Sequence, residues 1–431
     1  MHVLFFTDNF PPEVNAPASR TFEHCREWVN AGHKVTVITC APNFPKGQVF
    51  PGFRNRTWQR ESMDGIDVIR VWTYITANEG LVRRTLDYAS FFVTAAPASL
   101  FVSDVDVIVA TSPQLFAPCA AFVSGLLKRR PYVFELRDLW PESIRAVGAL
   151  NSSRTLDLLE RLELFLYRRA AHIVSVTSAF RDNLVSRNVP PEKISVVTNG
   201  ADLSRFRPTV RDEALAAELD LSEKTVVGYV GTHGMAHSLT TILEAAALAK
   251  ADPDLGNVRF LFLGDGAEKS ALKAEAENKQ LTNVLFLDSV PRSEVVRYWS
   301  IVDMAVIHLK KTPLFKTVIP SKLFECMAMG IPVLHGVEGE SAEIVDRERA
   351  GLLFEPENPS ALCGRIRQLL HEPGLLAACR TNGLDAATRY DRRHLAKVML
   401  SKLQDIAGQQ SANELREADG PGDTAPANHA R

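Results

Sequence analysis

The chain has 431 residues, of which 46% are hydrophobic and 23% are charged, and its formal net charge at pH 7 is −2. A chain of this length exceeds what one hydrophobic core usually organises, so we expect two domains. The composition is typical of a soluble globular protein, and the near-neutral charge excludes the basic excess that marks nucleic-acid-binding proteins.

The cysteines and the first residues of the chain indicate the cellular compartment in which we expect the protein. The six cysteines are scattered without a C-x-x-C pair or a neighbouring histidine pattern. This spacing favours reduced cytoplasmic thiols over a disulfide framework or a zinc site. The first residues lack a basic leader, and their apolar run is too short for a signal peptide. We therefore expect a cytoplasmic protein.

The first half of the chain alternates strand-like and helical stretches. It opens with a strand at residues 3–6, a helix that ends before Gly32 and a second strand at residues 35–39. A strand, helix, strand unit requires a parallel sheet. Further strands are predicted at residues 67–72, 105–110, 132–136, 172–176 and 194–197, with helices near residues 115–127 and 156–170. We predict a doubly wound, Rossmann-like α/β domain over residues 1–206.

An uncharged apolar stretch at residues 88–103 follows Arg83 and Arg84. It is shorter than the roughly 20 residues that a membrane-spanning helix needs. A basic edge beside an apolar helix is typical of a protein that lies on an anionic membrane, and a core helix is the alternative. The segment from Arg83 to Ser103 is therefore one candidate for peripheral contact with the cytoplasmic membrane.

A charged, aromatic loop follows the strand at residues 132–136. It concentrates Arg137, Asp138, Trp140 and Glu142 within a few positions. Burial of such groups is unfavourable unless they have partners or a purpose. We predict that Arg137 and Asp138 act in catalysis, and a salt-bridged surface turn is the alternative.

The alternation restarts after a polar, glutamate-rich segment that ends before Thr225. Strands are predicted at residues 226–230, 258–263, 284–287 and 304–308, with helices between them. We predict a second Rossmann-like domain over residues 207–389. Ligands of doubly wound sheets bind outside the carboxyl ends of the strands, so the loops at those ends matter most.

Glycine-rich loops follow the strands of this second domain. Gly231 lies in a G-x-x-G-x-x-G run, whereas a nicotinamide dehydrogenase would show G-x-G-x-x-G. Gly264 and Gly266 flank Asp265 after the next strand, where glycine lets the backbone approach a ligand closely. Each loop alone could be an ordinary turn. Together, at consecutive strand ends, they predict a nucleotide site.

The stretch from Pro320 to Leu334 predicts a short helix followed by a strand. Pro320 suits the first helical turn, and Gly330 suits the position just after the helix. Lys322 and Glu325 lie one turn apart near the N-terminus of this helix, where N–H groups attract anions. A ligand with both phosphates and sugar hydroxyls would fit, as in a nucleotide sugar. The alternative is that Lys322 and Glu325 merely pair with each other.

The run from Glu325 to Val333 resembles a motif of the retaining glycosyltransferases of family 4, which have the GT-B fold. That family has a glutamate, seven residues and then Glu-(Ala/Cys)-Met-Ala-x-Gly-x-Pro-Val in its second domain. Thr317 stands here in place of the first glutamate. The variant Pro-Ser-Lys-Leu-Phe-Glu is similar to the branch that builds bacterial surface polysaccharides, such as the O-antigen L-fucosamine (FucNAc) transferases. The resemblance extends over most of residues 1–400.

The resemblance implies roles for residues of the donor site. Glu325 would bind the nucleotide ribose, and backbone groups around Val290 would read the base. Relatives place a basic pair after the glycine that matches Gly231, but this chain has Thr232 and His237 at the roughly matching places. The positive charge has to come from elsewhere, and the candidates are Lys310, Lys316 and Lys322. Further residues expected near the nucleotide, the sugar or the phosphates are Ser321, Asn15, Ala16, Glu340 and Ser341.

We predict a retaining glycosyltransferase that moves a sugar from a nucleotide sugar to a lipid-linked or saccharide acceptor in surface-polysaccharide biosynthesis. A UDP-linked donor is expected, with an N-acetylated deoxy sugar as a candidate. We expect no metal or other cofactor, because basic side chains and a helix N-terminus can neutralise the departing diphosphate. The alternatives are a nucleotide-sugar epimerase on the same fold and a non-catalytic nucleotide-sugar-binding protein.

The C-terminal end of the chain has two predicted parts. The family resemblance implies that a last helix, around residues 390–406, crosses back onto the first domain. Residues 408–431 have almost no apolar anchors, so we predict a disordered tail there.

Overall fold

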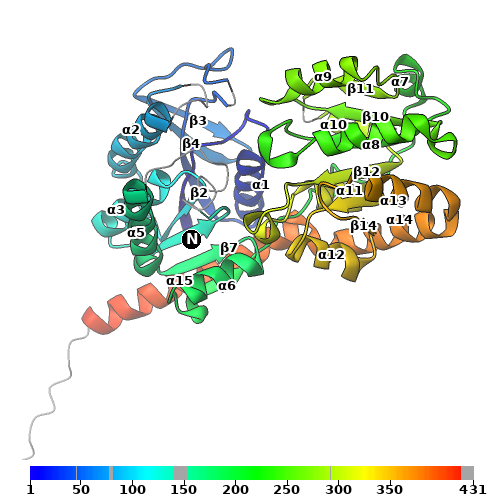
Figure 1. Cartoon of the computed structure of the whole chain (residues 1–431). Coiled ribbons are helices and arrows are strands. Elements are labelled where there is room, and N and C mark those ends of the chain that lie inside the picture. The colour runs from blue at the N-terminus through cyan, green and yellow to red at the C-terminus, as the bar shows by residue number, and fades with distance from the viewer. Residues whose placement is uncertain (45, 77–80, 140–152, 292, 419–431) are drawn as a thin grey trace, which may run out of the picture.

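The computed structural model describes residues 1–44, 46–76, 81–139, 153–291 and 293–418. These residues form two α/β domains that stand side by side, with the first drawn in blue to green and the second in green to orange (Figure 1). Each domain is built around its own mainly parallel sheet. The predicted pair of Rossmann-like domains is confirmed.

The sheet of the first domain is mainly parallel. Its strands are β1 (His2–Phe6), β2 (Lys34–Cys40), β3 (Trp58–Met63), β4 (Ile66–Val71), β5 (Val107–Thr111), β6 (Tyr132–Leu136), β7 (His172–Ser175) and β8 (Ile194–Val196). Their order in the sheet is β3-β4-β2-β1-β5-β6-β7-β8. Strands β1, β5 and β6 are buried along their whole length, because helices cover both faces of the sheet, and their sequences are accordingly mainly apolar.

Strand β3 was not predicted from the sequence. It pairs with β4 as an antiparallel hairpin. Asp64 and Gly65 form the two-residue turn, with φ angles of 49° and 80°. An Asp-Gly pair favours this turn because both positions need positive φ. The Asp-Gly dipeptide after an alternating strand was therefore the signal that could have predicted the hairpin.

Helices cover both faces of the first sheet. They are α1 (Ala16–Asn30), α2 (Leu81–Ser99), α3 (Phe116–Lys128), α5 (Ser153–Arg169) and α6 (Ser178–Ser186). Side chains cap two of them: the Asn15 Oδ1 accepts from the N–H of Ala18, and the Thr177 hydroxyl accepts from the N–H of Phe180. Within the part of the chain that the structure describes, no helix is both long and apolar enough to cross a bilayer.

The sheet of the second domain is parallel throughout. Its strands are β9 (Thr225–Val230), β10 (Val258–Leu263), β11 (Val284–Leu287), β12 (Met304–His308), β13 (Val333–Gly336) and β14 (Gly351–Leu353), in the order β11-β10-β9-β12-β13-β14. The helices are α7 (Glu213–Glu218), α8 (Thr240–Ala251), α9 (Lys269–Asn278), α10 (Val295–Trp299), α11 (Lys322–Met329), α12 (Glu340–Glu348), α13 (Pro359–His371) and α14 (Pro373–Ala387). The carboxyl ends of these strands lie along one edge of the sheet.

Helix α11 begins two residues later than the sequence suggested. Ser321 is the N-cap residue and Lys322 the first helical residue, so Pro320 precedes the helix. Gly330 ends the helix as predicted, because its φ of 68° is left-handed and its N–H bonds back to the carbonyl groups of Cys326 and Met327. The predicted spacing of Lys322 and Glu325 on one face is unaffected.

The last helix, α15 (Arg392–Ala418), returns to the first domain and lies along it (Figure 1). The indole N–H of Trp28 in α1 donates to the carbonyl oxygen of Ala396 at 2.9 Å. Leu395 and Met399 join the core beneath α1. The expectation of a disordered tail from residue 408 is wrong as far as Ala418, because the helix continues to that residue. Residues 419–431 lie outside the described part of the chain.

The two cores meet near residue 200. Val197 packs in the core of the first domain, whereas Ala201 and Phe206 already pack in a core of the second. An isolated parallel β-bridge between Ala201 and Asp391 joins the two segments of the chain that connect the domains. The change of domain therefore occurs a few residues before position 206.

Candidate active site

The loops at the carboxyl ends of β9 and β10 touch each other in the second domain. A Cβ atom on Gly264 would lie 1.9 Å from the carbonyl oxygen of Gly231, and one on Gly266 would lie 2.4 Å from that of His233. The packing of the two loops therefore requires glycine at both positions. A Cβ atom on Gly231 would lie 3.5 Å from its nearest neighbour, the hydroxyl oxygen of Tyr229. The protein itself does not require a glycine at Gly231, whereas a closely bound ligand would.

Lys269 fixes the same loops, and the sequence analysis missed it. Its ammonium group donates to the carbonyl oxygens of Gly264 and Leu287, at 2.7 and 2.8 Å, and to the Asp288 carboxylate at 2.6 Å. An ammonium has three N–H donors, so all are used within the protein. Lys269 thus holds the loops after β10 and β11 in place. Val290 lies in the second of these loops. No sequence pattern separates such a lysine from a surface one.

Two histidines shape the loop after β9. The His308 Nδ1 donates to the carbonyl oxygen of His237 at 2.8 Å, and the His308 Nε2 accepts from the N–H of Glu357 at 2.9 Å. These two roles fix a neutral imidazole. Burial lowers the pKa of both His308 and His237. His237 is therefore uncharged near neutral pH, and it cannot supply the positive charge of the family's basic pair.

The three candidate lysines differ in their partners. The Lys316 ammonium pairs with the Glu338 carboxylate at 3.0 Å, and the Lys322 ammonium pairs with the Glu325 carboxylate at 2.8 Å. The main-chain N–H of Lys310 donates to Ala236, which places Lys310 beside the loop after β9. Among the described residues, the Lys310 ammonium has no hydrogen-bond or ion-pair partner. Lys310 is thus the uncommitted cation of the three.

Glu325 lies in the first turns of α11 and is 7% exposed. Its bond to Lys322 shows that the pairing considered from the sequence does form in the absence of a ligand. Ser321 makes no capping bond with its side chain. The Thr317 hydroxyl, at the position of the family's first glutamate, donates to the carbonyl oxygen of Leu314 at 2.6 Å. The predicted contact of Glu325 with a ribose stays a prediction.

Glu340 connects the two domains. Its carboxylate accepts the N–H groups of Ser178 and Ala179, at 2.9 and 2.8 Å, at the N-terminus of α6. A carboxylate at a helix N-terminus is favourable, because it satisfies unpaired N–H groups and the helix dipole. The neighbouring Ser341 is fully buried, and its hydroxyl has no partner. In this arrangement Glu340 serves an interdomain contact, and its role toward a sugar stays a prediction.

The loop after β6 carries a half-buried arginine, Arg137. The Ser112 hydroxyl accepts the N–H groups of Arg137 and Asp138, at 2.8 and 3.3 Å, and so anchors the loop. The Nε and Nη1 atoms of Arg137 are buried and have no hydrogen-bond partner among the residues that the structure describes. Burial lowers the pKa of Arg137 to about 10, so the group remains protonated at neutral pH. A half-buried cation with two buried, unused donor atoms favours an anionic ligand.

The other predicted residues of the first domain have mixed outcomes. Asn15 caps α1, and its amide nitrogen donates to the Asn9 side chain at 2.5 Å. Ala16 is the first residue of α1. Trp140 and Glu142 lie outside the described residues, so their predicted part in the charged loop has no structural counterpart here.

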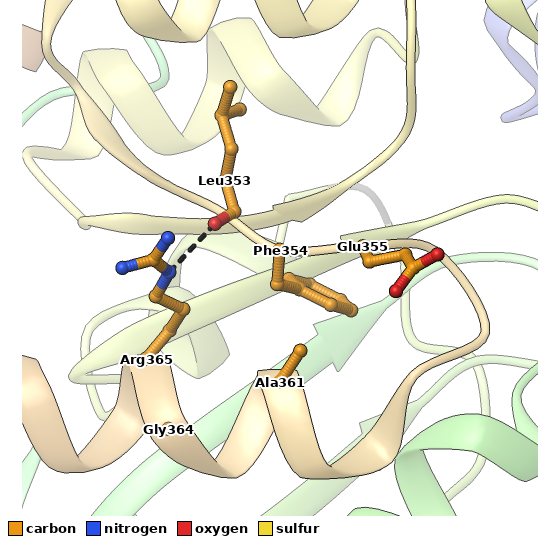
Figure 2. A pocket seen from close by; sticks show the side chains of 6 residues that line it. All are labelled: Leu353, Phe354, Glu355, Ala361, Gly364 and Arg365. Atoms are coloured by element: carbon orange, nitrogen blue, oxygen red, sulfur yellow. Dashed lines mark hydrogen bonds between the residues drawn. The ribbon is translucent and has the colours of Figure 1, made fainter.

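An open hollow of about 520 Å³ lies between the end of β14 and α13 (Figure 2). Figure 2 shows Arg365 reaching from α13 to the carbonyl oxygen of Leu353, to which its Nε donates at 2.8 Å. The Phe354 ring lies above Ala361 in the same view. None of the predicted site residues lines this hollow, and we do not include it in the site.

Comparison with known proteins divides the chain into the same two domains. Residues 15–200 match the glycosyl transferase 4-like domain, and residues 210–385 match the glycosyl transferases group 1 family. A putative colanic acid biosynthesis glycosyl transferase, WcaI of Escherichia coli, is 24% identical over 425 residues, which cover 95% of this chain and all of the relative.

The chain is a glycosyltransferase.

Solved structures support the GT-B fold of this glycosyltransferase. HepE of Anabaena in complex with UDP has a TM-score of 0.69 at 17% identity, over 94% of this chain and all of that chain. Sucrose-phosphate synthase of Thermosynechococcus elongatus has a TM-score of 0.75 at 17% identity, over 95% of this chain and 99% of that chain. The glycosyltransferase therefore has relatives named for polysaccharide biosynthesis and structural neighbours that hold UDP.

Proposed function

We propose that the enzyme is a retaining glycosyltransferase that transfers a sugar from a UDP-sugar to a lipid-linked or saccharide acceptor in surface-polysaccharide biosynthesis. The UDP complex of a structural neighbour and the naming of WcaI for colanic acid biosynthesis support this reading. The Pro320–Glu325 motif supports an N-acetylated deoxy sugar, as in the O-antigen FucNAc transferases, as the transferred group. The donor binds at the strand ends of the second domain.

The observation that carries the proposal is the uncommitted ammonium of Lys310, whose main-chain N–H bonds to Ala236 in the same loop after β9 that contains Gly231. A diphosphate needs positive charge and close approach to the backbone, and this corner of the second domain offers both. The guanidinium of Arg137, whose Nε and Nη1 atoms have no hydrogen-bond partner among the described residues, offers a second cation from the first domain. Because these groups can stabilise the departing diphosphate, we propose that transfer needs no bound metal.

The test is a calorimetric titration of UDP, GDP and dTDP against the wild type and three lysine variants, with and without a chelator. Lys310→Ala should weaken UDP binding by about 1.5–3 kcal/mol, the value of a hydrogen bond to a charged group. Lys316→Ala and Lys322→Ala are matched controls, and both should lose less because those lysines have protein partners. A loss confined to Lys322→Ala would refute the Lys310 assignment. Equal weak binding of all three nucleotides would refute the proposed donor class.

We also propose that the enzyme contacts an anionic membrane through an apolar stripe on α2. Leu86 and Val93 of α2 and Leu100, just after its end, recur every seven residues and are 52%, 64% and 55% exposed. Phe101 is 78% exposed and packs edge-on against Trp58, with ring centroids 5.6 Å apart. The opposite side of α2 is buried. The membrane-contact interpretation therefore applies to the exposed face of the helix, and the core-helix interpretation applies to its buried face.

Vesicle flotation tests this contact. Binding to anionic vesicles should fall with added salt, because basic residues such as the exposed Arg83 contribute through screened charge. Val93→Ser should lower binding, whereas Leu248→Ser, on an exposed part of α8 in the other domain, should not. Equal partitioning to neutral and anionic vesicles would contradict the charge contribution, and no change in Val93→Ser would contradict the stripe.

A further inference from the structure

Glu357, in the loop after β14, has a backbone conformation that is unusual for its side chain. Its φ angle is 59°, in the left-handed region that glycine and asparagine adopt far more readily than glutamate. Its carboxylate bonds to Ser238, whose φ of 45° is also left-handed. A strained backbone persists only where the surrounding structure holds it, and such residues gather at functional sites. The contacts that hold Glu357 join three loops of the second domain.

The carboxylate of Glu357 bonds two other loops at the same edge of the sheet. Its Oε2 accepts the main-chain N–H of Lys311 at 3.0 Å, and its Oε1 accepts the Ser238 hydroxyl at 3.1 Å. Lys311 directly follows Lys310 in the loop after β12, and Ser238 directly follows the short helical turn Met235–His237 in the loop after β9. One side chain thus ties the loop that carries Lys310 to the loop after β9.

The main chain of Glu357 is fixed by the buried His308. The N–H of Glu357 donates to the His308 Nε2 at 2.9 Å, and the His308 Nδ1 donates to the carbonyl oxygen of His237 at 2.8 Å. The His308 ring is 1% exposed and stacks on the Phe354 ring, with centroids 5.8 Å apart. The left-handed backbone of Glu357 is therefore anchored to the core of the domain, while its carboxylate bonds the loops after β9 and β12.

Further bonds fix the main chain around Lys310. The N–H of Lys310 donates to the carbonyl oxygen of Ala236 at 2.9 Å, and the Lys311 ammonium donates to the Glu355 carboxylate at 2.8 Å. The backbone of Lys310 is thus bonded at its own N–H and at the next one, whereas its ammonium has no partner among the described residues. A fixed backbone that carries an uncommitted ammonium is preorganised to bind an anion.

We propose that Glu357 is a positioning residue of the donor site, which holds Lys310 where it binds the diphosphate by tying the loop after β12 to the loop after β9. The inference rests on the proposed function, and it adds a residue that acts without touching the donor. The negative charge of Glu357 repels a diphosphate, so its contribution lies in the bonds it makes within the protein. Glutamine can make both bonds, because its oxygen accepts the Lys311 N–H and its amide donates to the Ser238 hydroxyl oxygen.

Two substitutions of Glu357 separate its bonds from its strain. Glu357→Gln keeps both bonds and should bind UDP as the wild type does. Glu357→Gly removes the bonds and should weaken UDP binding about tenfold, the lower end of the loss expected for removing the Lys310 ammonium itself. Its melting temperature should stay within a few degrees of the wild type, because glycine relieves the left-handed strain. If Glu357→Gly binds UDP as tightly as the wild type, or if Glu357→Gln loses as much affinity as Glu357→Gly, the proposal is wrong.

A control variant and a second background test the route of the effect. Asp220 has a φ of 57° and precedes the amino end of β9, so Asp220→Gly relieves the same kind of strain away from the site and should bind UDP normally. In a Lys310→Ala background, Glu357→Gly should cause little further loss of UDP binding, because the ammonium that it positions is absent. A second tenfold loss in that background would show that Glu357 does not act through Lys310 and would overturn the proposal.

Hydrogen exchange of the ligand-free protein separates this inference from the proposed function. Glu357→Gly should speed amide exchange at residues 236–238 and 310–312, whereas Glu357→Gln and Asp220→Gly should not. Unchanged exchange in Glu357→Gly would overturn the proposal, even if UDP binding weakens. A wild type that does not bind UDP would refute the proposed donor class, whereas faster exchange in Glu357→Gly alone would still show that Glu357 holds the main chain of Lys310.

Discussion

The two domains present opposite chemistry at the same structural place, the carboxyl ends of their parallel strands. In the first domain this edge holds a cavity lined by carboxyl groups, and burial raises the pKa of Asp8, Glu13 and Asp87 to about 7. In the second domain the edge has glycine loops and Lys310, whose ammonium group has no partner among the described residues. One fold, used twice, thus presents one edge lined by carboxyl groups and another edge with glycine loops and a lysine. The difference teaches that function here resides in the loops and not in the fold.

The largest expected effect separates structural glycine from ligand-facing glycine. Gly264→Ala should lower the free energy of unfolding by about 2–3 kcal/mol, because the new Cβ overlaps the carbonyl oxygen of Gly231. Gly231→Ala should leave thermal unfolding unchanged and weaken UDP binding. Thermal melts and UDP titration of both variants measure this. A Gly231→Ala variant that binds UDP normally would place the diphosphate elsewhere.

The next effect tests the ribose contact. Glu325→Gln should weaken UDP binding by about 1.5–3 kcal/mol, because one carboxylate oxygen becomes a donor. The wild type should also lose affinity for the 2′,3′-dideoxy nucleotide, and the variant should lose much less, because the contact is already broken. Titration of both proteins with both nucleotides measures the coupling. Equal losses would mean that Glu325 only pairs with Lys322.

The interdomain contact predicts a smaller effect. Glu340→Ala removes the carboxylate that bonds Ser178 and Ala179, so the domains should separate more readily. The free energy involved is about 0.5–2 kcal/mol, as for other helix caps. Small-angle scattering of the ligand-free protein should show a larger radius of gyration, and Glu343→Ala, on the same helix, is the control. An unchanged radius would show that other contacts hold the domains together.

The smallest effect concerns pH. The raised pKa of Glu13 means that the folded protein binds more protons than the unfolded chain between about pH 4.5 and 7, so the contribution of Glu13 to stability falls as pH rises through that window. The glutamine of Glu13→Gln does not titrate, so this variant does not lose stability at this position as pH rises. The variant should therefore gain melting temperature relative to the wild type from pH 5 to pH 8, by a few degrees at most. A difference that is flat with pH would contradict the buried, unpaired state of Glu13.

Much of the fold could be predicted from the sequence, because buried parallel strands are apolar runs separated by helices. Strand β12 lies at the predicted residues 304–308, and Gly330 ends α11 as expected. The β3–β4 hairpin was missed because its edge strand alternates and carries charge. The start of α11 was misplaced because a proline just before a helix resembles one inside its first turn.

The site was harder to predict, because its decisive contacts join residues far apart in the chain. The roles of Lys269 and Glu357 depend on loops that only the folded sheet brings together. Glu13 stands two residues before Asn15, which the sequence analysis expected near the nucleotide, the sugar or the phosphates, and the unpartnered Oε2 of Glu13 is visible only in three dimensions. The family motif located Glu325, but it could not reveal that Lys322 is paired while Lys310 is not.

The binding of the donor diphosphate at the edge of the second domain is the central claim, and one titration tests it most directly. UDP is titrated against the wild type, Lys310→Ala and Glu13→Gln. We predict that Lys310→Ala weakens UDP binding and that Glu13→Gln leaves it unchanged. If Lys310→Ala binds UDP as the wild type does, or if Glu13→Gln weakens UDP binding equally, the two edges do not have separate roles and the account is wrong.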